Sequence, residues 1–485
     1  MTHARGIWSL KIEMMNTTMK NQKKTAPTIH RTRKGLRLPI AGEPAQKITP
    51  ANPVTQVAVT AVDFPGIRPR MAVVEGDRVA RGTLLFEDRK NKGVRFTSPG
   101  AGTVAAIQRG ERRALLSVII TLDDAERTEG GTPASVRFEA FKGTPAAQLT
   151  GDEALGLLTE SGLFTAIRRR PFDRIPSPKE TPRALFVMAS GGHPLSPDPT
   201  VVVAASPAAW AQGLIALKRL IGDAPLYVIL GPLGEVPVPE IPGVAVHRFD
   251  GRFPFGTPGS AMHVIDPVDR GRKAWYIGYQ DAIAFGSLVK TGRPDVTRVV
   301  ALSGPGVANP RLVRTRVGAA IGTLIQGEGR AGDYRVLSGS VLGGREADGG
   351  PLDFLGCYHD QITVIENTAE RRLLGWLAPG ADTFSVSRLF ISKLMPKSRL
   401  RFTTDQKGGE RVMVPIGLFE KVWPFDLLVT PLLRALLAGD DETSEALGCL
   451  ELGEEDVAVC SFVCPSKIDY GAALRSTLDR IEEQG

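Results

Sequence analysis

Three of the four cysteines in this 485-residue chain lie close together near its end, at Cys449, Cys460 and Cys464. The spacing Cys460-x3-Cys464-Pro465 matches the second half of the C-x2-C-x2-C-x3-C-P run that holds iron–sulfur clusters. Glu454 and Val457 stand where two earlier cysteines of that run would be. Because a four-iron cluster needs four thiolates, we expect a degenerate ferredoxin-like segment with buried structural thiols. A three-thiolate metal site and a redox-active disulfide remain alternatives.

The pattern of the chain near its N-terminus predicts short strands. Residues 72–85 and 96–104 each alternate apolar residues around a glycine turn, as half-buried strands do. Together they resemble the two halves of biotinyl and lipoyl carrier domains, which have the barrel-sandwich hybrid fold. Carriers place a modified lysine at the hairpin tip, near the position of Lys90. The residues around Lys90 do not match the carrier pattern, so we expect a solvated hairpin tip.

The middle of the chain has the pattern of a Rossmann-like α/β domain. Residues 183–190 and 226–231 are short apolar runs that predict buried strands. Between them, Ser206 and Pro207 have the residue types of an N-cap and a first helical position, followed by one apolar helical face. No G-x-G-x-x-G turn is present and residues 191–199 form a proline-rich loop, which disfavours a phosphate-binding turn.

Motifs along the whole chain carry a family resemblance. They are Lys34–Gly42, Gly278–Asp281, Asn309–Thr315, Met413–Gly417 with Glu420–Val422, and Gly448–Lys467. In this order they resemble the NqrA family, the A subunit of the sodium-translocating NADH:quinone oxidoreductase, from about residue 34 to the C-terminus. Each motif alone would be weak, whereas the set is specific.

The resemblance implies a multidomain α/β protein with a disordered basic extension before it. We expect an extension at 1–33, a barrel-sandwich hybrid domain at 34–130, a Rossmann-like α/β domain at 131–270, a β-grasp domain of the soluble-ligand-binding (SLBB) type at 271–345, and a C-terminal β/helical region with the degenerate ferredoxin-like segment at 346–485.

Local signals place elements in the last two domains. Strands are expected at 297–303, 334–337, 361–366 and 372–377, and helices at 385–394, 431–438 and 474–483. Asn309 and Pro310 predict the start of another helix. Its apolar stripe would be Val313, Val317, Ile321 and Leu324. Arg311, Arg314 and Arg316 would then line one side of that helix, as a solvated face or as a docking face for an acidic partner.

The resemblance implies a function within a larger complex. Family members are peripheral, cytoplasmic-side subunits of a bacterial inner-membrane complex that oxidises NADH, reduces ubiquinone and exports Na+. The implied partners are the membrane subunits B to F, with NADH, ubiquinone, flavins and iron centres in the complex and none bound by this chain. The alternative is a flavin- and NADH-binding input subunit that resembles the C subunit of the Rnf complex. That alternative requires a glycine-rich flavin loop and four cysteines.

Candidate residues for a quinone or anion site follow from the same resemblance. Related flavin-binding subunits carry a glycine-rich loop where this chain has the bulky, cationic residues 162–172. Arg168, Arg169 and Arg170 are therefore candidate partners of an anion or a quinone headgroup. His263 is a further candidate, because it remains from a longer histidine-containing loop of the family. We identify no catalytic residue and no metal site.

The basic charge of the chain is concentrated at its N-terminus. Residues 1–37 carry nine Lys and Arg and one Glu, which accounts for the formal net charge of +8 and leaves the remainder neutral. This distribution disfavours nucleic acid as a partner. It favours a solvated tail or attraction to an anionic lipid surface. No apolar run in the sequence is long enough to span a bilayer.

Overall fold

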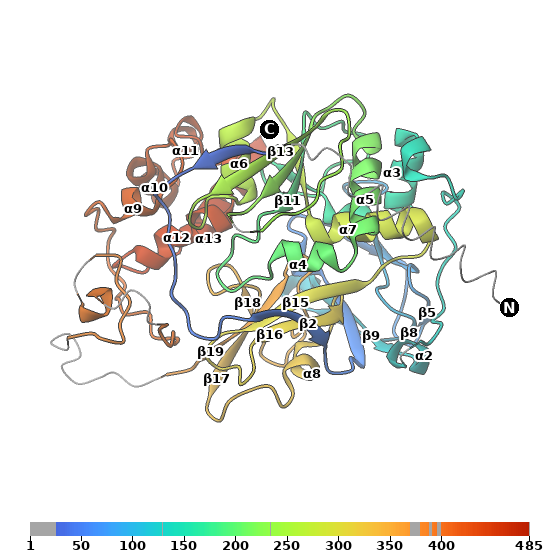
Figure 1. Cartoon of the computed structure of the whole chain (residues 1–485), viewed down its shortest axis with the longest axis horizontal. Helices are drawn as coiled ribbons and strands as arrows, with labels where there is room; N and C mark the ends of the chain where they lie inside the picture. The colour runs from blue at the N-terminus through green and yellow to red at the C-terminus, as the bar shows by residue number, and fades with distance from the viewer. Residues whose placement is uncertain are drawn as a thin grey trace, which may run out of the picture.

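The computed structural model describes residues 26–128, 130–232, 234–368, 379–387, 390–394 and 399–484. Figure 1 shows an α/β unit beside two β-rich units, with the red C-terminal helices grouped at one side. The mixed α/β fold class, with barrel-sandwich hybrid, α/β and SLBB-type units, agrees with the sequence prediction.

The N-terminal unit is a barrel-sandwich hybrid built from two antiparallel sheets. One sheet has the order β3 (Gln56–Thr60), β9 (Leu115–Leu122), β8 (Gly102–Arg109) and β5 (Arg78–Val79). The other has the order β4 (Pro69–Met71), β6 (Leu84–Asp88) and β7 (Arg95–Thr97). Phe86 and Phe96 stack in its core with ring centroids 4.4 Å apart. Lys90 is exposed in the turn between β6 and β7.

The α/β unit contains a six-stranded sheet in the order β1-β13-β12-β11-β14-β10. Its strands are β1 (Thr28–Arg31), β10 (Arg168–Arg170), β11 (Leu185–Ala189), β12 (Leu226–Leu230), β13 (Val244–Asp250) and β14 (Ala274–Gly278). All pairs are parallel except β10 with β14. The predicted strands at 183–190 and 226–231 are confirmed as β11 and β12.

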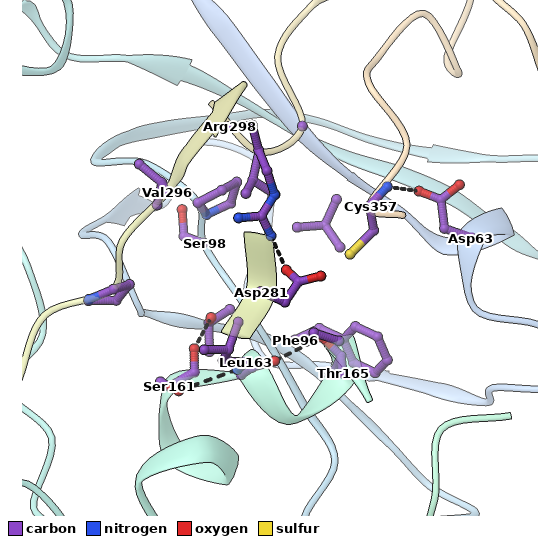
Figure 2. A pocket seen from close by; sticks show the side chains of 18 of the residues that line it. Asp63, Phe96, Ser98, Ser161, Leu163, Thr165, Asp281, Val296, Arg298 and Cys357 are labelled. Atoms are coloured by element: carbon purple, nitrogen blue, oxygen red, sulfur yellow. Dashed lines mark hydrogen bonds and ion pairs between the residues drawn. The ribbon is translucent and has the colours of Figure 1, made fainter. Parts of the chain in front are cut away.

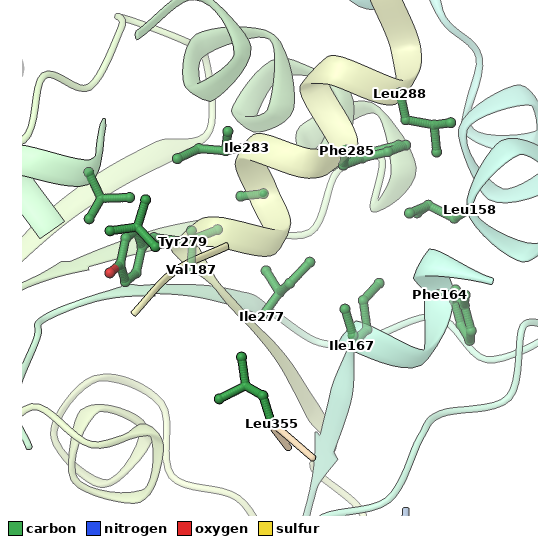
Figure 3. Close-up of a cluster of buried hydrophobic side chains, with 14 of the residues drawn as sticks. Leu158, Phe164, Ile167, Val187, Ile277, Tyr279, Ile283, Phe285, Leu288 and Leu355 are labelled. Carbon is green, nitrogen blue, oxygen red and sulfur yellow. The ribbon is translucent and has the colours of Figure 1, made fainter. Parts of the chain in front are cut away.

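Helices cover both faces of this sheet. They are α3 (Gly151–Ser161), α5 (Pro207–Leu220) and α7 (Tyr279–Thr291) on one face and α6 (Pro258–Ile265) on the other. The helix predicted to begin at Pro207 is confirmed as α5. Figure 3 shows Tyr279, Ile283 and Phe285 of α7 beside Val187 and Ile277 of the sheet.

The helices α5 and α7 pack unusually closely because glycines face one another. A Cβ atom on Gly213 would lie 1.9 Å from the carbonyl oxygen of Ala282, and one on Gly286 would lie 1.9 Å from that of Ala209. No larger side chain fits at either position without moving backbone, so both glycines fix the position of α7 over the sheet.

Two of the predicted domain boundaries do not coincide with the limits of the α/β unit. The first boundary is predicted at residue 33, with a disordered extension before it. Residues 28–31 instead form β1 and pair with His247 to Asp250 of β13. The side chain of His30 also hydrogen-bonds that of His247, with Nε2 and Nδ1 2.9 Å apart, and this partner lies too far away in sequence to be recognised. The second boundary, at residue 270, falls inside the unit because β14 joins the sheet beside β11. Residues 1–25 lie outside the described residues.

The third unit is a second six-stranded sheet in the order β18-β17-β19-β15-β16-β2. Its strands are β2 (Ala45–Pro50), β15 (Thr297–Ser303), β16 (Arg311–Arg316), β17 (Tyr334–Ser338), β18 (Arg345–Glu346) and β19 (Gln361–Glu366), with the short helix α8 (Ile321–Ile325) beside them. The predicted strands at 297–303, 334–337 and 361–366 are confirmed.

The predicted helix after Asn309 is wrong, because these residues form β16. The strand pairs with β15 on one side and β2 on the other. The β-branched residues Val313 and Thr315 suit this central position, and the pairing overrides the local Asn-Pro start signal. The predicted arginine face of a helix is therefore not formed. Arg311 forms an ion pair with Glu328 at 2.7 Å, and the side chain of Arg316 is buried.

The C-terminal helical unit has its own apolar core. It comprises α9 (Leu418–Val422), α10 (Val429–Ala438), α11 (Asp441–Ala446), α12 (Glu454–Val463) and α13 (Tyr470–Gln484). The helices predicted at 431–438 and 474–483 are confirmed as parts of α10 and α13. In the predicted helix at 385–394, the described residues show only a 3-10 turn at Ile391–Leu394. The predicted strand at 372–377 lies outside the described residues.

The clustered cysteines lie in this C-terminal core. Cys449, Cys460 and Cys464 are fully buried and form no disulfide. Burial raises the pKa of the Cys449 thiol to about 12 and raises that of Cys460 as well. All three side chains pack in the apolar core of the C-terminal helical unit.

Candidate functional site

The edge strand β10 places three consecutive arginines against the C-terminal helices. Arg170 is completely buried, and its Nη2 atom lies 3.3 Å from Oε1 of Glu455 in the first turn of α12. A Cβ atom on Gly453 would come within 2.2 Å of the Arg170 guanidinium, so only glycine allows this approach. Asp173 lies 3.8 Å from Arg170 on the other side.

The two neighbouring arginines are also paired with acids of this chain. The Arg168 guanidinium lies between the rings of Tyr276 and Tyr358, 4.5 and 4.1 Å from their centroids, and 3.2 Å from Asp173. Although burial opposes ionisation of Asp173, Arg168 and Arg170 hold its pKa at about 2. Arg169 pairs with Glu180 at 2.9 Å and with Glu482 of α13 at 3.5 Å. The arginines are thus neutralised within the chain.

Asp456 completes the contact between α12 and the α/β unit. Its Oδ1 accepts a hydrogen bond from Thr257 Oγ1 at 2.6 Å, and its Oδ2 accepts one from the Gly453 amide at 2.8 Å. Burial raises the pKa of Asp456 to about 7, whereas Arg170 opposes the shift. Three acidic residues in the first turn of α12 also suit the positive end of its helix dipole.

His263, the fourth residue predicted for the site, holds the same two units together. Its Nδ1 lies 2.8 Å from Glu451 Oε2, and its Nε2 accepts a hydrogen bond from the Asp426 amide at 3.0 Å. Both ring nitrogens are therefore engaged by the C-terminal helical unit. Of the four predicted site residues, Arg168 lines the larger of the two cavities described below.

A cavity lies at the topological switch point of the sheet, and we call it the switch cavity. The chain passes from β11 outward to β12 and β13 and then returns to add β14 on the opposite side of β11. Ligands of open α/β sheets bind at this crevice, beyond the carboxyl ends of the strands. Its polar lining includes Arg168, Ser190, His193, His359, Asp360 and Glu455, with Gly191, Gly192 and Gly278 where the strands end.

The titratable groups of the switch cavity have strongly perturbed pKa values. Burial lowers the pKa of His359 to about 4, and its Nδ1 lies 2.8 Å from Ser338 Oγ. Although burial opposes it, Glu455 raises the pKa of His193, whose Nε2 lies 3.6 Å away. Burial raises the pKa of Asp360. Such perturbed groups in a concave site mark a candidate functional site.

A second, mostly apolar cavity lies where the three β-containing units meet, and we call it the junction cavity. Figure 2 shows Asp281 of α7 directed toward Arg298 of β15, with Cys357 and Asp63 to the right and Phe96 and Leu163 below. The Asp281–Arg298 ion pair and Cys357 line both cavities. The pair therefore lies at the boundary between the two cavities.

Sequence reasoning identified one lining residue of the switch cavity and missed the others. His193 lies in the proline-rich loop that argued against a nucleotide, and Asp281 ends the motif Gly278–Asp281. Both residues belong to segments that the sequence analysis had singled out. No local pattern could show that these segments meet His359 and Glu455 at one cavity. Among the described residues, no group of His, Cys, Asp and Glu is arranged to hold a metal ion.

The fold and the site define a multidomain α/β protein in which a barrel-sandwich hybrid, an α/β and an SLBB-type unit surround two cavities. Family models match it as the NqrA N-terminal barrel-sandwich hybrid domain over residues 30–123, the NqrA second alpha/beta domain over 149–294 and the NQRA C-terminal domain over 299–349. No helix in the described part of the chain is long and apolar enough to cross a membrane.

Curated relatives extend this match along the chain. The A subunit of the Na(+)-translocating NADH-quinone reductase of Pasteurella multocida (strain Pm70) is 46% identical over 453 residues, covering 93% of this chain and 99% of the relative. The same protein from Klebsiella pneumoniae (strain 342) is 46% identical over 455 residues, with the same coverage. That of Cellvibrio japonicus (strain Ueda107) is 45% identical. The chain belongs to the NqrA family, the A subunits of the Na(+)-translocating NADH-quinone reductases.

Replacing Arg170 tests its role in joining the units. We expect Arg170→Met to lower the free energy of unfolding by about 3 to 5 kcal/mol, because it removes the arginine partner of Glu455 and one of the two arginine partners of Asp173 in a buried cluster. The measurement is urea unfolding followed by circular dichroism. Arg314→Met is the matched control, since Arg314 is exposed on β16. Equal effects of the two substitutions would contradict this role.

His359 predicts a pH dependence of stability. Its pKa is about 4 in the folded chain and near the ordinary 6.5 in the unfolded chain, so the unfolded state takes up the proton first as the pH falls. Stability from this group is complete above pH 6.5 and is lost toward pH 4, by up to about 3 kcal/mol. Unfolding measured across this range should show a shallower loss for His359→Gln than for the native chain. Identical slopes would refute the assignment.

Proposed function

We propose that this chain is the peripheral, cytoplasmic-side A subunit of a bacterial inner-membrane complex that oxidises NADH, reduces ubiquinone to ubiquinol and exports Na+. Support comes from the names of relatives that align over 99% of their own length. Its partners would be the membrane subunits B to F. The three β-containing units and the C-terminal helices provide extended surfaces for such a scaffold.

We further propose that the chain has no redox centre of its own, and that flavins and iron centres reside in other subunits. The arginine strand β10 supports this, because Glu455, Glu482 and Asp173 already neutralise the cations that an anionic cofactor would need. Burial also raises the pKa of the Cys449 and Cys460 thiols, which disfavours the thiolate form that cluster ligands need. The alternative, a flavin- and NADH-binding input subunit, finds no specific support in these contacts.

We propose that the quinone headgroup binds in the switch cavity. The main support is the position of Arg168 in the lining of this cavity. A quinone headgroup is a neutral planar ring with carbonyl oxygens that accept hydrogen bonds. Arg168 combines a cationic donor with the aromatic walls Tyr276 and Tyr358 in a cavity at a topological switch point. Arg169, Arg170 and His263 would position this region through the C-terminal helices, rather than contact the quinone.

Gly192→Val tests the quinone contact without removing a charge or a hydrogen bond. A Cβ atom at residue 192 meets nothing closer than Ser190 Oγ at 3.8 Å, so the fold tolerates the added bulk in the cavity wall. In the assembled complex we expect the KM for ubiquinone to rise at least about fivefold, within the range that changed pocket contacts produce. NADH oxidation with an artificial acceptor should remain unchanged.

The matched control is Gly343→Val, at a glycine whose Cβ meets no atom within 4 Å and which lies outside the lining of either cavity. An unchanged KM in Gly192→Val would reject the cavity as the quinone contact while leaving membership of the complex intact. Flavin bands in the visible spectrum of the purified native chain would instead favour the electron-input alternative.

A further inference from the structure

A row of exposed cations lies on the segment that leaves β1. Arg31, Arg33, Lys34 and Arg37 are all exposed, and we call residues 31–37 together with the adjacent Arg252 the basic strap. Figure 1 shows this dark-blue segment running from β1 past the C-terminal helices toward β2. Asp250 pairs with Arg31 at 3.3 Å, and no other described acid is found in an ion pair with the strap.

The backbone of the basic strap is held in place by contacts with the body of the protein. The Leu36 amide donates to the Phe253 carbonyl at 2.7 Å, and Leu36 itself is buried in the core of the C-terminal helices. Gly35 has φ +102°, and a Cβ atom there would lie 2.6 Å from the Arg252 carbonyl oxygen. Glycine therefore permits the strap to lie against residues 250–253 and brings Arg252 beside it.

The sequence before the basic strap carries further positive charge. Residues 1–25 contain five Lys and Arg and one Glu. The family model begins at residue 30, and the relatives match 93% of this chain while being covered over 99% of their own length. Most of this charge therefore lies outside the aligned family sequence, whereas residues 38–485 are neutral overall.

We propose that the basic strap binds the headgroups of anionic phospholipids and orients this chain on the membrane surface. Clustered Lys and Arg are attracted to the negative surface potential of such a membrane over about one Debye length, roughly 10 Å. The alternative polyanion, nucleic acid, would gain from aromatic residues that stack on bases. The aromatic residues nearest the strap, Phe253 and Phe255, are buried. This surface is a property beyond the proposed electron-transfer function.

Vesicle sedimentation of the full chain tests the proposal. The probes are phosphatidylcholine vesicles with and without phosphatidylglycerol, at low and raised ionic strength. We expect binding only to the anionic vesicles, weakened by salt and not displaced by inorganic phosphate at equal ionic strength. The variant Arg33→Gln, Lys34→Gln, Arg37→Gln, Arg252→Gln should lose at least about tenfold in vesicle affinity.

A charge-matched control isolates the position of the cations. Lys90→Gln, Lys92→Gln, Arg112→Gln, Arg113→Gln removes four exposed cations of the barrel-sandwich hybrid unit and should bind vesicles as the native chain does. Equal losses in the two variants would overturn the proposal, because they would indicate dependence on net charge alone. Binding to neutral vesicles, or tighter binding to duplex DNA than to anionic vesicles, would overturn it as well.

Discussion

The arrangement of the α/β unit and the C-terminal helical unit depends on the ion pairs of the buried Arg170 guanidinium. A cation without solvent must have anions beside it, and Glu455 and Asp173 supply them from two different units. Around it, Arg174 pairs with Asp479 and Glu482 of α13 at 2.7 and 2.8 Å. Detaching the C-terminal helices would leave these charges uncompensated, so the α/β unit and the helical unit constrain each other.

This constraint also determines which chemistry is left for ligands. Carboxylates of α12 and α13 pair with Arg170 and Arg169 of β10, so these arginines join the C-terminal helices to the α/β unit. Of the three arginines, Arg168 lines the switch cavity, beside Tyr276, Tyr358 and the glycines at the strand ends. Glu451 and the Asp426 amide, which belong to the same helical unit, engage both nitrogens of His263. The packing of the C-terminus thus shapes the cavity at the end of the sheet.

The sequence predicted what depends on local pattern and failed where distant residues decide. Continuous apolar runs predicted β11 and β12, and Ser206-Pro207 predicted the start of α5, because these signals lie within a few residues. Asn309-Pro310 gave an equally local helix signal, but pairing with β15 and β2 prevailed. The arginine triplet was predicted to meet an anion or a quinone headgroup, whereas Glu455, the partner of Arg170, lies 285 residues away in the sequence. No local pattern could reveal that the anion belongs to the chain itself.

Native-state hydrogen exchange tests most directly whether these charge contacts make one cooperative structure. Amides of α12 and of the central strand β11 should exchange through openings of the same free energy and the same denaturant dependence, because α12 cannot leave without exposing the Arg170 cluster. Exchange of α12 through a smaller opening, while β11 stays protected, would contradict the account and make the helical unit an independently mobile attachment.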